Sequence, residues 1–82
     1  MSNSNPPIGT ATLATPDEAR EHYASGGIVL VHEGTEPTLS VTSNTNTHSR
    51  NHGVTSWSGL EEQVKFWSNR YTNQNYYTVE FG

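Results

Sequence analysis

Two of the four histidines, His48 and His52, have the spacing of metal ligands. Residues four apart share one face of a helix, and two imidazoles placed there can bind zinc. Residues 43–53, however, contain no apolar side chain that would hold a helix against a core. A third ligand would have to come from His32, Glu33 or elsewhere, and the pattern fixes none. We therefore expect an exposed loop here and no metal site.

The remaining polar residues do not form a catalytic motif. Cysteine is absent, and no serine has the glycine frame of a nucleophile elbow. Glu61 and Glu62 are adjacent, so on a helix they point about 100° apart and do not make a carboxylate pair. Gly26 and Gly27 precede an apolar run without a following lysine, which does not fit a phosphate loop. We expect neither enzymatic activity nor a cofactor.

The acidic residues are concentrated in the first half of the chain. The formal net charge is −4, with eight acidic and four basic residues. Up to residue 41 the single basic side chain, Arg20, stands against five acids, namely Asp17, Glu18, Glu21, Glu33 and Glu36. Such a surface repels phosphate backbones and attracts basic partners, although solubility alone also accounts for it. The charge therefore argues against nucleic acid and favours a protein with a basic surface.

Length and hydropathy indicate one small domain outside the membrane. The chain has 82 residues, enough for one core without disulfides or metals. No segment approaches the roughly 20 apolar residues of a membrane span, and residues 1–7 lack the basic and apolar regions of a signal peptide. We expect a cytoplasmic protein that does not associate with membranes.

The first elements follow from turn and capping residues. Residues 1–14 are rich in Ser, Asn, Thr and Pro, which predicts a flexible N-terminal arm ahead of a domain at residues 15–82. Thr15 as cap, Pro16 in the first turn and Glu18 as the partner of a capping box predict a helix to about residue 25. Gly26 and Gly27 end it. Residues 28–31 and 38–42 are predicted as a β-hairpin.

The second half contains the clearest local pattern, an amphipathic helix over residues 58–71. Ser58 and Glu61 are spaced as a capping box, and an apolar stripe with helical periodicity follows, made of Leu60, Val64, Trp67 and Tyr71. Residues 76–81 then alternate as a last strand, with Tyr77, Val79 and Phe81 inward. The expected fold is α+β in the order α-β-β-α-β, with a three-stranded, mainly antiparallel sheet covered by the second helix.

Two surfaces are candidates for binding a partner. Phe66 lies off the apolar stripe of the second helix, and together with an outward Tyr76 and an unassigned Trp57 it would form an aromatic contact patch. The first helix offers acidic side chains instead, those of Asp17, Glu18 and Glu21.

These features favour a non-enzymatic protein-binding module, a small acidic inhibitor or adaptor. In size and acidity, though in no motif, the chain resembles virus-encoded inhibitors of host nucleic-acid enzymes, anti-CRISPR proteins among them. One alternative is a self-assembling subunit that adds residues 54–57 or its last strand to a neighbouring sheet. Another is single-stranded nucleic-acid binding by Trp57 and Tyr76 with the basic residues Arg50, Lys65 and Arg70.

Overall fold

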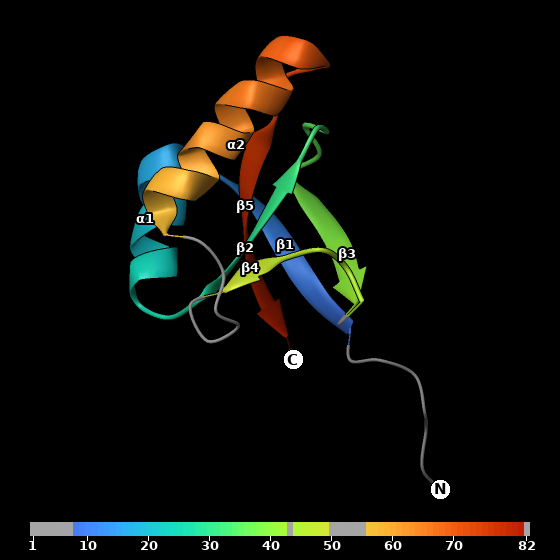
Figure 1. Cartoon of the computed structure of the whole chain (residues 1–82). Coiled ribbons are helices and arrows are strands. Elements are labelled where there is room, and N and C mark those ends of the chain that lie inside the picture. Colours follow the sequence, from blue (N-terminus) through green and yellow to red (C-terminus); the bar gives the residue numbers. More distant parts are fainter. Residues whose placement is uncertain (1–7, 43, 50–55, 82) are drawn as a thin grey trace, which may run out of the picture.

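The computed structural model describes residues 8–42, 44–49 and 56–81, which form two helices and five strands (Figure 1). In chain order these are β1 (Ile8–Ala14), α1 (Pro16–Ala24), β2 (Ile28–His32), β3 (Thr38–Thr42), β4 (His48–Ser49), α2 (Trp57–Arg70) and β5 (Asn75–Phe81). The α+β class is as predicted. The sheet, however, has five strands instead of three.

The strands run in the order β3-β1-β5-β2-β4, and every neighbouring pair is antiparallel. β5 lies at the centre, between β1 and β2. The predicted arm was wrong for residues 8–14, which form β1; residues 1–7 lie outside the described part. The predicted hairpin was also wrong, because β1 and β5 separate β2 from β3. Small residues let β1 pack closely, and Ala11 is fully buried between Leu39 and Val79.

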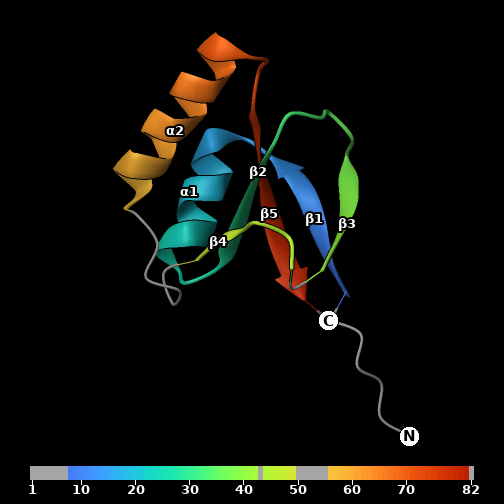
Figure 2. The same ribbon diagram turned by 45° about the vertical axis from the view of Figure 1, so that its right-hand side comes forward.

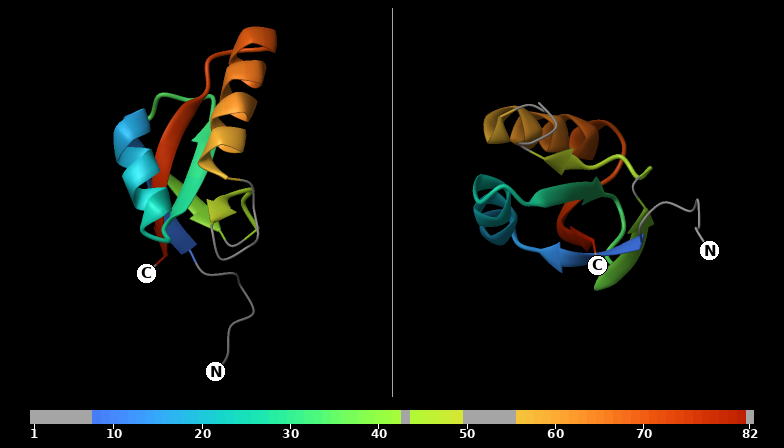
Figure 3. Two further views of the ribbon diagram at one scale, coloured as in Figure 1. Left: turned by 60° about the vertical axis from the view of Figure 1, so that its left-hand side comes forward. Right: turned by 90° about the horizontal axis from the view of Figure 1, so that it is seen from below.

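The sheet is buried on both faces along β2 and the first part of β5, whereas β1 and β3 leave one face exposed. Both helices cover one face, where Val29 and Tyr76 pack with Ala19, Tyr23 and Leu60 (Figures 2 and 3). The other face holds a second cluster without a helix, made of Ala11, Leu30, Val41, Tyr77 and Val79. Because β5 is central, its consecutive residues Tyr76 and Tyr77 are both buried, so the predicted outward orientation of Tyr76 was wrong.

Side chains of β5 hydrogen-bond to the segment that links β2 to β3, residues 33–37. The Tyr77 hydroxyl lies 2.8 Å from the Glu36 carbonyl oxygen and 3.2 Å from that of Gly34. The Asn75 side chain donates to the same Gly34 oxygen at 2.9 Å. Burial, and then the charge of Glu36, raise the pKa of Tyr77, which keeps the hydroxyl protonated as a donor.

The helix ends were predicted with unequal success. The capping box of Thr15 and Glu18 is present, and Gly26 follows α1 with a φ of 94°, so these predictions are confirmed. α2 begins at Trp57, and its cap is Ser56, whose hydroxyl accepts from the Gly59 amide. The predicted capping box of Ser58 and Glu61 was therefore wrong, since Ser58 lies within the first turn.

Only the first part of α2 is fixed against the sheet. Leu60 is 1% exposed and Val64 is partly buried in the same cluster. Trp67 and Tyr71 are 45% and 66% exposed, so the prediction that they are core residues was wrong. Figure 1 shows that the last turns of α2 rise past the ends of the strands.

Candidate functional site

The exposed aromatic side chains of the molecule gather at the C-terminal half of α2. Phe66 is 55% exposed and contacts Trp67, which in turn contacts Tyr71; we call these three residues the aromatic end. The rings of Trp67 and Tyr71 are stacked, with centroids 5.1 Å apart and planes 20° apart. Phe66 meets Trp67 edge to face at 5.2 Å. Contiguous exposed apolar surface of this kind marks interaction sites more often than scattered single residues do.

A charged residue, Arg70, lies beside the aromatic end. Its guanidinium carbon lies 5.8 Å from the centroid of the Tyr71 ring, within cation–π distance. The arginine thus adds a hydrogen-bond donor beside the stacked rings. Trp, Tyr and Arg are the residue types most enriched at the energetic centres of protein interfaces.

Sequence reasoning identified Phe66 at this site but missed Trp67 and Tyr71. Both have the spacing of the apolar stripe, which predicts burial if the sheet extends under the whole helix. One available signal was the polarity around Tyr71, because residues 68–70 and 72–75 are all polar. The neighbouring residues in sequence therefore offer no apolar side chains that could bury the Tyr71 ring.

Trp57 and Tyr76 do not join Phe66 in one patch. Their rings stack on each other between the start of α2 and the sheet, with centroids 5.0 Å apart, and the centroid of the Tyr23 ring lies 5.7 Å from that of Trp57. Tyr76 is 7% exposed, and burial followed by the charge of Glu61 raises its pKa. The structure therefore separates the predicted aromatic residues into a core pair and the exposed Phe66.

The acidic side chains of α1 are exposed, but Glu18 has a structural role. Its carboxylate accepts from the Thr15 backbone amide at 2.9 Å, while the Thr15 hydroxyl accepts from the Glu18 amide at 3.2 Å. The bonds to the Thr15 backbone and side chain lower the pKa of Glu18. The other two acidic residues of α1, Asp17 and Glu21, take no part in this capping box. Glu21 lines a shallow depression beside Leu13.

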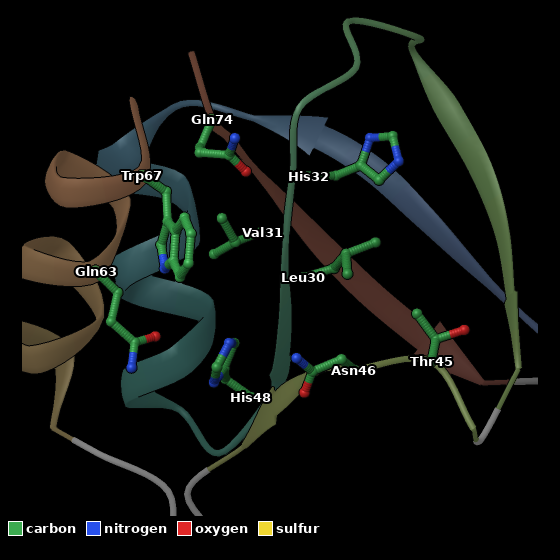
Figure 4. Close-up of a pocket in the computed structure, with 9 residues that line it drawn as sticks. All are labelled: Leu30, Val31, His32, Thr45, Asn46, His48, Gln63, Trp67 and Gln74. Atoms are coloured by element: carbon green, nitrogen blue, oxygen red, sulfur yellow. The ribbon is translucent and has the colours of Figure 1, made fainter. Parts of the chain in front are cut away.

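A groove of about 420 Å³ lies between β2 and α2 (Figure 4). We call it the β2–α2 groove. Trp67 and Gln63 reach it from α2, and Val31 lies across from Trp67. Its lining residues are Leu30, Val31, His32, Thr45, Asn46, His48, Gln63, Trp67 and Gln74. None of these described residues is an Asp, Glu, Lys or Arg, and Trp67 also belongs to the aromatic end.

Burial changes the pKa of one residue in the groove, His48. Its Nδ1 atom is buried and has no hydrogen-bond partner among the described residues. Burial lowers the pKa of His48, which favours the neutral ring. His52, the other histidine of the metal-like spacing considered above, lies outside the described residues, and no three His, Asp or Glu side chains within the described ranges gather as a metal-ligand group.

Comparison with protein families, with curated proteins and with solved structures finds no match for this chain. Within residues 8–42, 44–49 and 56–81, no helix has the length and apolar content needed to cross a membrane.

Proposed function

We propose that this protein is a non-enzymatic protein-binding module that docks a partner on the aromatic end of α2. The observation that carries the proposal is the exposure of three adjoining aromatic rings, from 45% to 66%, on helix turns that project past the sheet. Burying a side chain such as Phe66 in an interface removes apolar surface from water, which stabilises the complex. The contacts of Trp67 with Phe66 and Tyr71 restrict these rings before binding, which lowers the entropy cost of ordering them.

The charge distribution favours a protein partner over single-stranded nucleic acid. Stacked aromatic rings can also bind bases, but such sites lie in positively charged grooves. Here the whole chain has four basic residues against eight acidic ones. A partner with a basic surface is attracted by that excess of negative charge, as expected for an acidic inhibitor or adaptor.

The test is an affinity measurement with matched surface variants. The full chain is used to capture proteins from a cell extract, and the captured protein is purified and titrated against wild type, Phe66→Ala with Tyr71→Ala, and Asp17→Lys with Glu21→Lys. Glu62→Ala, an exposed position on the same helix, is the control. We expect the aromatic double variant to bind at least about tenfold more weakly, since each central aromatic residue contributes about 2 kcal/mol or more.

Three results would overturn this assignment. Equal affinity of the aromatic double variant and wild type would show that the partner docks elsewhere, and a loss confined to the charge-reversal variant would place it on α1. A stable oligomer in sedimentation, dissociated by the aromatic substitutions, would instead identify the aromatic end as a self-assembly surface.

A further inference from the structure

The outer edge of β2 is only partly paired. On its inner side β2 pairs with β5 along its whole length, from Ile28 to His32. On its outer side β4 pairs with Ile28 and Val29 alone. Within the described part of the chain, residues 30–32 therefore have no strand partner on that side. Such an edge presents unpaired backbone donors and acceptors to an incoming strand.

The β2–α2 groove lies along this unpaired edge. Figure 4 shows Val31, Trp67 and Gln63 on the helix side of β2, and Leu30 and Asn46 toward the opposite side. An added strand places alternate side chains on the two sides of the sheet, so both sets of wall residues would contact it. Residues 30–32 span about 10 Å of edge, which is enough to pair with three residues of an added strand.

We propose that the β2–α2 groove binds an extended segment of a partner protein, which adds to the sheet beside residues 30–32. This inference rests on the proposed function and specifies how the partner binds. The segment hydrogen-bonds to the β2 backbone and places an apolar side chain between Val31 and Trp67. Trp67 belongs to both surfaces, so the rest of the partner reaches Phe66 and Tyr71.

The charges around the groove define the chemistry of the segment. The described lining residues include no Asp, Glu, Lys or Arg, and they offer amide groups from Asn46, Gln63 and Gln74 that suit a peptide backbone. Beyond the groove, the exposed Glu33 directly follows β2, and the whole chain carries −4. Charge complementarity therefore calls for an uncharged, apolar stretch with lysine or arginine beside it.

The experiment uses random octapeptides displayed on phage, selected on the full chain. The best peptide is synthesised and titrated against wild type, Gln63→Trp, and the control Ser58→Trp. Gln63→Trp fills the groove, whereas Ser58 is exposed on the same helix and does not line the groove. Amide hydrogen exchange by NMR follows residues 30–32, with circular dichroism to confirm that each variant is folded.

We expect selected peptides with an apolar centre and basic flanks, and at least tenfold weaker binding to Gln63→Trp than to Ser58→Trp. Exchange should slow at alternate amides of residues 30–32, because only every second amide of a strand faces a given edge. This readout uses wild type, so it holds even if Gln63→Trp fails to fold.

Three outcomes overturn strand addition. The first is a bound peptide that leaves exchange at residues 30–32 unchanged. The second is the absence of any selected peptide while a purified partner still loses affinity in the Phe66→Ala and Tyr71→Ala variant; the proposed function then stands without this binding mode. The third is protection of the same amides that rises with protein concentration alone, which would make a second copy of the chain the occupant.

Discussion

Two truncations on α2, Leu60→Ala and Phe66→Ala, should differ sharply in their effect on the free energy of unfolding. Leu60 is 1% exposed, and removing such a side chain costs about 2–5 kcal/mol because a cavity remains. Phe66 is 55% exposed, so its truncation forfeits somewhat less than half of the roughly 1.5–3 kcal/mol of full burial. The higher helix propensity of alanine returns about 0.5 kcal/mol. The net cost of Phe66→Ala is therefore below about 1 kcal/mol.

The assay is urea denaturation followed by far-ultraviolet circular dichroism, with both variants fitted alongside wild type. If the free energy of unfolding falls with urea concentration at the same slope in all three proteins, their unfolded states are comparable. We expect the fitted cost of Leu60→Ala to be at least about twice that of Phe66→Ala. Equal costs would mean that Phe66 is part of the core, and its assignment to a binding surface would lose its basis.

Three further predictions concern polar groups. Tyr77→Phe should cost about 1–3 kcal/mol and speed amide exchange in residues 33–37, because the Glu36 carbonyl loses its donor; unchanged exchange there would contradict the role of the hydroxyl. Thr15→Ala should cost about 0.5–2 kcal/mol. Bonds to Thr15 lower the pKa of Glu18, so the ionised carboxylate stabilises wild type above about pH 4.3, and this stability is lost as the pH falls. Urea titrations of Thr15→Ala should therefore show a smaller decrease in the free energy of unfolding on acidification than those of wild type. Burial lowers the pKa of His48, so its neutral ring contributes stability above about pH 6.5 that is lost as the ring protonates. His48→Gln should flatten the stability profile between about pH 7.5 and 5, and an unchanged profile would refute this.

Local signals predicted local structure well. Thr15, Glu18 and Gly26 act through neighbours within a few residues, and the structure places α1 between them as predicted. The strands at residues 28–32, 38–42 and 75–81 likewise follow from their β-branched and aromatic residues.

The errors arose where distant contacts decide the outcome. β1 has weak strand propensity, and its Ala11 is buried because the chain returns as β3 and β5 on either side. The apolar stripe of α2 gives no information on how far the sheet extends beneath it, so Trp67 looked like core. The β2–α2 groove had no sequence signal, since its lining comes from β2, β4, α2 and residues near them.

The central position of β5 also affects when the fold can form during synthesis. β1 and β2 do not pair with each other; each pairs with β5, which leaves the ribosome after all other described elements. Before then, β2 has only the two-residue β4 as a strand neighbour. A nascent chain that stops before residue 75 therefore has no continuous sheet and exposes apolar surface that chaperones bind. Folding must wait for the last strand and then proceed through contacts between distant residues, which are slow to form.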